Sequence, residues 1–323
     1  MSRPLALFFA MTGIALAIPA PYESDGTWKA LASIPIVPRQ EWSVVALSNT
    51  DIAMIGGIVP NASGQGMIIT PLMQIYNIPS DTRYTASPAP TPVNHPSFAA
   101  VNGRLYLLGG LTIAPDGSWR AFSDSWAYDH QSDVWEALEP WPLSEERGSA
   151  TTVVYGEMIY LAGGMRTLEP IGPDGEQDTV GFVPAFNTSS QDWIAIPQVA
   201  SALPEGRDQA AASIIGTKMY VIGGRLRGQY SVKDTVFVFD LEDLESGWST
   251  LLEVTPTAQG GVVCGTVGEE IFVLGGEGNE AEGSDGVFDE TEVFNTKTKS
   301  WKKLDVMPLP RHGGSAVAVD ELI

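Results

Sequence analysis

The 323-residue chain has little of what several common protein classes need: one cysteine, three histidines, and 18 Lys and Arg against 39 Asp and Glu. A single cysteine excludes an internal disulfide, and Cys264 lies in an apolar run typical of a core strand. The histidines are far apart and lack metal-ligand spacing, so we expect no metal site. A formal net charge of −21 repels phosphate groups, so we expect neither a nucleic-acid partner nor binding to anionic membranes.

Long hydrophobic runs are also missing, with one exception at the N-terminus. Arg3 precedes an apolar stretch from Leu5 to Leu16, and Ala15-Leu16-Ala17 has the small-x-small pattern of a cleavage site. We therefore expect a signal peptide over residues 1–17, or up to residue 20, with residues 21–323 as a single secreted domain without a membrane anchor. Two sequons predict glycosylation at Asn61 and Asn187.

The chain does contain a repeat. An apolar strand that ends in Gly-Gly occurs five times, with the pairs beginning at Gly56, Gly109, Gly163, Gly223 and Gly275. After each pair come a polar segment, a strand that ends in an aromatic residue and Asp or Asn, and then a tryptophan or tyrosine. Intervals of 52 to 60 residues between the pairs indicate propeller blades of about 50 residues each.

These features, in this order, resemble the kelch repeat, and the resemblance covers nearly all of the chain after residue 20. It implies an all-β, six-bladed kelch-type β-propeller with a closing blade shared between the two termini. Ser315 to Ile323 would supply inner strands of that blade, and Trp28 its outermost strand. The shared blade lacks a Gly-Gly strand, which leaves open whether it is abbreviated or the sequence is truncated.

Two sets of residues are candidates for a site on the face where the Gly-Gly strands end. The segments after the glycine pairs are long and contain large apolar side chains, which either pack back on the blades or line an apolar pocket: Met67, Trp119, Phe122, Met165, Phe182 and Tyr230. A second column precedes each innermost strand, and its members either tie blades together or donate hydrogen bonds to a ligand: Arg39, His95, Arg147, Arg207, Gln259 and Arg311. Asp208, Gln209 and His312 lie beside this column.

The chain also resembles secreted fungal kelch proteins and, among them, the hetero-Diels–Alderases of tropolonic sesquiterpenoid biosynthesis. That resemblance implies an enzyme without cofactor that joins a tropolone quinone methide to a humulene-type terpene, with a small apolar terpenoid or tropolone as its only partner. We expect a monomer. On this interpretation Arg147, Arg207 and His312 are catalytic, and the substrate-binding residues are Trp119, Phe122, Tyr230, Arg225 and Gln209. The alternative is a non-catalytic propeller that binds a glycan or a protein.

Overall fold

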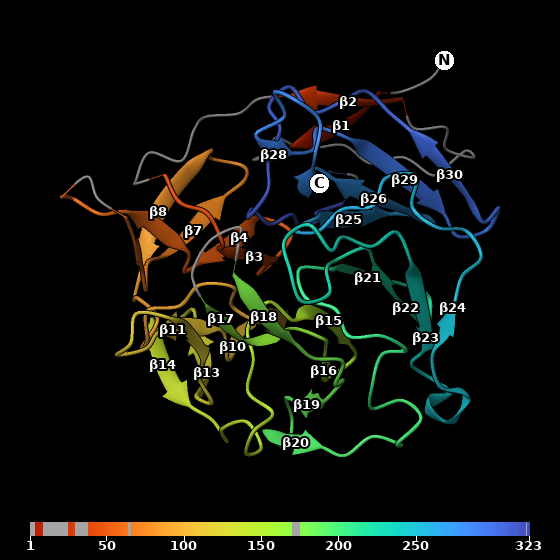
Figure 1. The fold of residues 1–323 in the computed structure, drawn as a ribbon. Helices are drawn as coiled ribbons and strands as arrows, with labels where there is room; N and C mark the ends of the chain where they lie inside the picture. The colour runs from red at the N-terminus through yellow and green to blue at the C-terminus, as the bar shows by residue number, and fades with distance from the viewer. Residues whose placement is uncertain (1–3, 9–24, 30–37, 64–65, 170–174, 321) are drawn as a thin grey trace.

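Each Gly-Gly strand is the second strand of a four-stranded antiparallel sheet in the computed structural model (Figure 1). The structure describes residues 4–8, 25–29, 38–63, 66–169, 175–320 and 322–323. Five such sheets, here called blades 1 to 5, follow in chain order. Blade 1 consists of β3(Ser43–Ala46), β4(Asp51–Ile55), β7(Met73–Asn77) and β8(Thr82–Ala86), and blade 2 of β9(Phe98–Val101), β10(Arg104–Leu108), β13(Ser125–Asp129) and β14(Val134–Ala137). Blade 3 consists of β15(Thr151–Tyr155), β16(Met158–Ala162), β19(Ala185–Asn187) and β20(Asp192–Ile194), and blade 4 of β21(Ala211–Ile215), β22(Lys218–Ile222), β23(Val236–Asp240) and β24(Ser249–Thr250). Blade 5 consists of β25(Val263–Val267), β26(Glu270–Leu274), β29(Thr291–Asn295) and β30(Ser300–Lys303).

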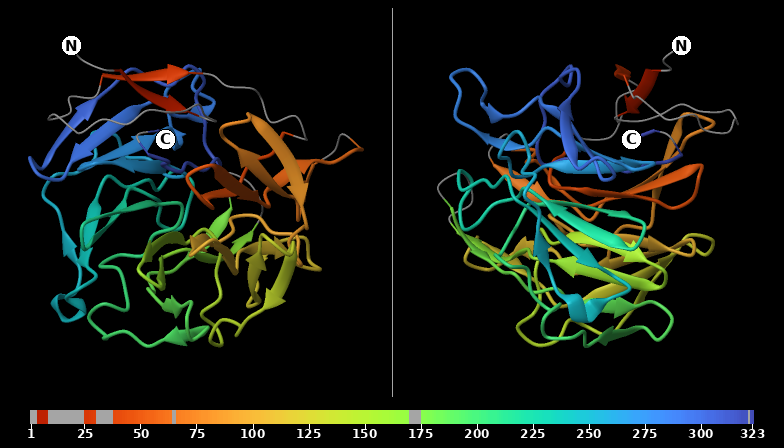
Figure 2. Two further views of the ribbon diagram at one scale, coloured as in Figure 1. Left: turned by 180° about the vertical axis from the view of Figure 1, so that it is seen from behind. Right: turned by 90° about the vertical axis from the view of Figure 1, so that its right-hand side faces the viewer.

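The blades stand around a common axis (Figure 2), and the first strands of neighbouring blades lie against one another near its centre (Figure 1). Apolar side chains of neighbouring sheets form one core cluster per interface, for example between blades 1 and 2 and between blades 3 and 4. The repeated tryptophans join successive blades. Each indole N–H donates to a backbone carbonyl of the preceding repeat, as Trp135 does to Ser87 at 3.0 Å and Trp248 to Ala200 at 2.9 Å. The kelch motif therefore marks the contacts that hold the ring together.

The glycine pairs are required by close approach between blades. Gly163 has φ +67°, and a Cβ there would lie 2.1 Å from the carbonyl oxygen of Arg207, at the start of the next blade. Gly164 donates its N–H to that same oxygen at 2.6 Å. A side chain would break this contact, so the pairs belong to the scaffold.

The sixth position in the ring differs from the other five. Ala316, Ala318 and Ile323 pack on blade 5 together with Trp28, whose indole donates to the Asp305 carbonyl at 3.2 Å, as the other tryptophans do. Val319 packs on blade 1, and the Val44 N–H donates to the Ser315 hydroxyl at 3.1 Å. β2(Asp25–Lys29) pairs in parallel with β1(Pro4–Phe8).

The all-β propeller is thus confirmed. The count of six blades and their closure stay predictions, because the described residues at the sixth position form no four-stranded sheet. Most of the predicted signal peptide lies outside the described residues, so residues 1–17 and their cleavage also stay predictions.

The long segments after the glycine pairs contain short hairpins that sequence analysis did not predict. They are β5(Ile58–Pro60) with β6(Met67–Ile69), β11(Leu111–Ile113) with β12(Trp119–Ala121), β17(Met165–Glu169) with β18(Glu176–Thr179), and β27(Glu277–Asn279) with β28(Gly286–Val287). β12 pairs with β17, so hairpins of blades 2 and 3 join into a further four-stranded sheet. A 3₁₀ helix over Leu244–Ser246 is the helical element of the described chain, which has no helix long and apolar enough to cross a bilayer.

Candidate functional site

A cavity of about 550 Å³ runs along the propeller axis. Its wall consists of inner segments from the five blades and from the C-terminal segment, and most of its side chains are Ala, Val, Ser or Thr. These segments are Trp42–Ala46, Pro96 with Phe98–Ala100, Ala150–Val154, Ala210–Ile214, Val262–Thr266 and Gly314–Ala318. The small side chains leave the axis open, and a cavity of this size is in the range of small-molecule sites.

One end of this channel carries a ring of residues in the left-handed region, which we call the rim ring. They occupy equivalent positions, with φ between 49° and 60°: Glu41, His95, Ser149, Gln209, Gly261 and Gly313. Backbone hydrogen bonds link neighbours around the axis, from His95 N–H to the Glu41 carbonyl at 3.0 Å and from Ser149 N–H to the His95 carbonyl at 2.9 Å. Glu41 N–H donates in the same way to the Gly313 carbonyl at 2.5 Å. Four of the six are not glycine, and strain of this kind is characteristic of functional sites.

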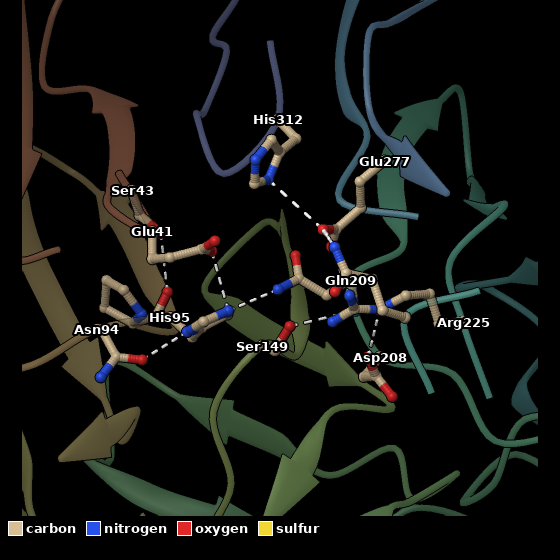
Figure 3. A network of polar contacts seen from close by, with 12 residues as sticks. Glu41, Ser43, Asn94, His95, Ser149, Asp208, Gln209, Arg225, Glu277 and His312 are labelled. Atoms are coloured by element: carbon tan, nitrogen blue, oxygen red, sulfur yellow. Dashed lines mark hydrogen bonds and ion pairs between the residues drawn. The ribbon is translucent and has the colours of Figure 1, made fainter. Parts of the chain in front are cut away.

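Two side chains of the rim ring, Glu41 and Gln209, lie against the same nitrogen of His95. Nε2 of His95 lies 2.9 Å from Oε2 of Glu41 and 2.5 Å from Nε2 of Gln209 (Figure 3). It can donate to Glu41 when His95 is protonated, or accept from Gln209 when His95 is neutral. Burial opposes ionisation of Glu41, but His95, His312 and Arg225 outweigh it and lower the Glu41 pKa to about 2. The mouth therefore offers a carboxylate–imidazole pair next to an amide donor.

An ion-pair network lies beside the rim ring, built from the first residues after the glycine pairs of blades 4 and 5. Arg225 bridges Asp208, at 3.2 Å, and Glu277, and all three side chains are at most 6% exposed. Nδ1 of His312 lies 3.5 Å from Oε2 of Glu277, and Nε2 of Gln229 donates to the same oxygen at 2.7 Å. Burial raises the pKa of Asp208 even though Arg225 lies against it. One guanidinium thus holds two buried carboxylates at the mouth.

The opposite side of the mouth is apolar at the same backbone positions. Ile58, Leu111 and Met165 directly follow the glycine pairs of blades 1 to 3, where blades 4 and 5 have Arg225 and Glu277. The three are at most 4% exposed. They cluster with Trp119 and Leu168 from the mouth hairpins, and the Trp119 ring lies 5.5 Å from the ring of His95, between centroids. An apolar wall and an ionic wall therefore face each other across the rim ring.

The structure brings three of the five predicted binding residues to this mouth, together with His312, which was predicted to be catalytic; of these four, Gln209 lines the cavity itself. Gln209, Arg225 and His312 belong to the polar network, and Trp119 to the apolar wall. Phe122 packs instead against the core between blades 1 and 2, and Tyr230 is 55% exposed on a loop outside the channel lining. Sequence analysis left two alternatives for the large loop side chains: they line a pocket or they pack on the blades. In the structure Trp119 lies at the mouth, whereas Phe122 packs on the blades.

The two arginines predicted to be catalytic lie in the scaffold. Arg147 and Arg207 are 0% and 1% exposed. Arg147 donates to the Phe182 carbonyl at 2.9 Å, and Arg207 to the Gly206 carbonyl at 2.8 Å and to Oγ1 of Thr235 at 2.6 Å. These contacts fulfil the tying role that sequence analysis gave as the alternative, and neither arginine is among the residues that line the channel.

The column of predicted donors needs one correction. Val93, not His95, is the residue of blade 2 that is equivalent to Arg39, Arg147 and Arg207. The Val93 carbonyl accepts the Gly57 N–H at 2.8 Å, and the Arg207 carbonyl accepts the Gly164 N–H in the same way. His95 lies two residues further on, in the rim ring. Counting two residues from each arginine would have found Glu41 and Ser149, which sequence analysis missed.

Cys264 and the sequons also have defined places. The Cys264 thiol lines the channel and donates to the Ala212 carbonyl at 2.9 Å, and burial raises its pKa to about 12, which disfavours a nucleophilic thiolate. Asn187 accepts the N–H groups of Ser189 and Ser190 in a turn at the outer edge, and Asn61 lies in the β5–β6 turn. Glycosylation of both asparagines stays a prediction.

Comparisons with known proteins agree with this architecture. The family profile described as "KLHDC2/KLHL20/DRC7 Kelch-repeats domain" matches residues 171–323. "Kelch-like protein terF" of Aspergillus terreus is 36% identical over 296 residues, or 90% of this chain; the chain spans 62% of the length of that relative. N-acetylneuraminate epimerase of Pasteurella multocida is 26% identical over 42% of this chain and 41% of its own length.

The solved structure titled "Structure of YjhT" superposes with a TM-score of 0.68 at 18% identity, over 87% of this chain and 88% of that one, and so shows the fold alone. The repeated motif, the sheets arranged around one axis and these similarities together identify the chain as a kelch-repeat β-propeller.

Proposed function

We propose that the protein is a cofactor-independent enzyme that binds a largely apolar small molecule at the channel mouth, and that its reaction is a hetero-Diels–Alder addition between a tropolone quinone methide and a humulene-type terpene. The observation that supports this best is the mouth itself. It opens into a cavity of about 550 Å³ with many Ala and Val side chains in its wall, and it has hydrogen-bond donors at its rim.

The reaction needs little from the protein beyond position and polarity. One C–O and one C–C bond form between the two partners, three π bonds become one, and no group leaves. Valine side chains of the channel wall, such as Val44, Val154 and Val317, would hold the hydrocarbon partner, and a fixed near-attack pose can lower the barrier by several kcal/mol.

The polar side of the mouth would act on the oxygen of the quinone methide. Gln209 presents amide N–H groups next to His95, and His312 is partly exposed beside Glu277. A donor aimed at an oxygen that gains negative charge in the transition state typically contributes about 10²-fold in rate. We propose Gln209 and His312 for this role, in place of the buried Arg147 and Arg207.

The test is incubation of the purified protein with a tropolone quinone-methide precursor and a humulene-type alcohol, followed by chiral chromatography of the adduct. We expect faster, stereoselective formation, lowered about 10²-fold in Gln209→Leu. Glu245→Gln, in the exposed 3₁₀ helix, is the matched control and should keep the wild-type rate. A racemic adduct formed at the background rate with the wild-type protein would remove the proposal.

The Glu41–His95 pair favours a second candidate, because a carboxylate–imidazole pair can move a proton and a cycloaddition does not require one. Such a pair suits epimerisation of a carbonyl sugar, in line with the similarity to N-acetylneuraminate epimerases. In N-acetylneuraminate such a pair would move a proton between the anomeric hydroxyl and the ring oxygen. Faster interconversion of its two anomers by NMR, lost in His95→Phe, would support this candidate.

A glycan- or protein-binding role without catalysis is the remaining alternative. Exposed aromatic side chains on loops, such as Tyr230 and Phe182, would serve it better than the channel along the axis does. We further propose a secreted monomer. Recovery of the protein from culture medium with a new N-terminus near residue 18 to 21 would support secretion, and sedimentation would test the monomer.

A further inference from the structure

In blades 1, 3 and 4 the arginine before the first strand donates a hydrogen bond to the residue just before the third strand. Arg39 donates to the Leu72 carbonyl at 3.1 Å, Arg147 to the Phe182 carbonyl at 2.9 Å, and Arg207 to Oγ1 of Thr235 at 2.6 Å. The three acceptor residues are equivalent, because their carbonyls receive the N–H groups of Gly56, Gly163 and Gly223, the first glycine of each pair. Each guanidinium therefore fills the same gap in front of the third strand.

Blade 5 has no arginine for this gap. Gln259 holds the position, since the Gly224 N–H donates to its carbonyl at 3.0 Å. The equivalent acceptor residue is Glu290, whose carbonyl receives the Gly275 N–H at 3.0 Å. Gln259 is 0% exposed, and its amide ends two bonds short of the reach of an arginine. A cation is thus replaced by a neutral amide at one end of the gap, and a carboxylate is added at the other.

The polar atoms at this place have no partner. Oε1 and Nε2 of Gln259, Oε2 of Glu290 and Oγ1 of Thr291 are all buried without a hydrogen bond to the described residues. The blades with arginine have apolar side chains where Thr291 stands: Met73, Val183 and Val236. Buried polar atoms without partners are costly, and three of these four are oxygens that an electron-pair acceptor in the gap would satisfy.

We propose that this gap binds a monovalent cation, Na⁺ or K⁺. The available ligands are oxygens: the Gln259 amide oxygen, the Glu290 carboxylate, the Thr291 hydroxyl and the carbonyl of Gly275, whose counterpart Gly163 accepts from Arg147 at 3.3 Å. Hard oxygen ligands select alkali and alkaline-earth ions over transition metals. One carboxylate matches one positive charge, as the guanidinium supplies in blades 1, 3 and 4. The cation would tie the connection before blade 5 to the sheet, independently of any activity at the channel mouth.

The experiment is thermal unfolding of the full chain at constant ionic strength, with choline chloride replaced stepwise by NaCl or KCl. We expect a saturable rise in Tm of about 2–5 °C with one of the two ions. Gln259→Arg should supply the arginine found in blades 1, 3 and 4, raise Tm in choline and abolish the response to the ion. Glu290→Gln should also abolish it, and Glu280→Gln, on an exposed loop, should keep it.

Two results would overturn the proposal. Equal Tm in choline, Na⁺ and K⁺ would mean that water fills the gap, and a response only to Ca²⁺ would mean that the charge is wrong. Persistence of the Na⁺ or K⁺ response in both Gln259→Arg and Glu290→Gln would place the cation elsewhere.

Discussion

The two walls of the channel mouth use the same backbone and opposite chemistry. On both walls the residue after Gly-Gly forms an isolated bridge with the residue just before the rim ring, as Leu111 does with Asn94 and Arg225 with Asp208. On one wall the side chains are Ile58, Leu111 and Met165; on the other they are Arg225 and Glu277. The comparison shows that the repeat fixes where a side chain stands at the mouth, while its chemistry varies freely from blade to blade.

The two walls are also stabilised by different interactions. The apolar wall is stabilised by burial and tolerates truncation at the cost of a cavity, whereas the ionic wall depends on every partner being present. Both walls stand on the same glycine contacts. The predictions below test first the ionic wall, then the shared frame, and then the rim ring between the walls.

Arg225→Met should have the greatest effect on stability. The change removes the guanidinium that lies between the buried carboxylates of Asp208 and Glu277, and with it the positive charge that both carboxylates contact. Breaking a buried pair from one side typically costs about 3–5 kcal/mol, measured here by urea unfolding. The matched control is Arg166→Met, whose pair with Asp178 is more than one-third exposed and should cost under about 1 kcal/mol. Equal losses in both variants would contradict the ionic wall.

Gly56→Ala and Gly275→Ala test the frame that the two walls share. Each has a positive φ, and in each a Cβ would lie 2.4 Å from a backbone oxygen, of Val93 and of Arg311 respectively. We expect both to lose about 2–3 kcal/mol in unfolding free energy, on the apolar and the ionic side alike. Gly156→Ala, with a similar φ of +59° and no atom within 4 Å, separates strain from contact and should lose about 1 kcal/mol.

Glu41→Gln should change the pH dependence of stability by about 2–3 kcal/mol. The Glu41 pKa is lowered to about 2 in the folded chain, against 4.5 unperturbed. A lowered folded pKa stabilises the protein above the unfolded value, and that contribution is lost as the pH falls from about 4.5 to 2. Urea midpoints across this range should therefore fall less steeply in the variant than in wild type. Parallel curves would mean that Glu41 does not interact with His95 in solution.

The frame could be predicted from sequence because its signals recur. The glycine pairs and tryptophans repeat at blade intervals, so each copy supports the others. The rim ring was missed in part because Val93 replaces an arginine in blade 2, which made His95 appear to belong to the arginine column. Arg225 and Glu277 lie 52 residues apart and meet only because neighbouring blades pack side by side, which no local pattern indicates.

The role of the hairpins at the mouth was equally out of reach. Trp119 was identified as a binding residue, but its place in the apolar wall depends on the pairing of β12 with β17 from the next blade. Arg147 and Arg207 have the residue type of a catalytic donor, and only the burial of their side chains shows their structural use.

Blocking the channel tests most directly whether the axis of the propeller is the reaction site. Ala212 lines the cavity, so Ala212→Phe would fill part of the space while Val134→Phe, on the exposed outer strand of blade 2, would not. We predict that adduct formation from the quinone methide and the terpene falls to background in Ala212→Phe and is unchanged in Val134→Phe, with both variants folded by circular dichroism. A wild-type rate in folded Ala212→Phe would contradict the channel as the site.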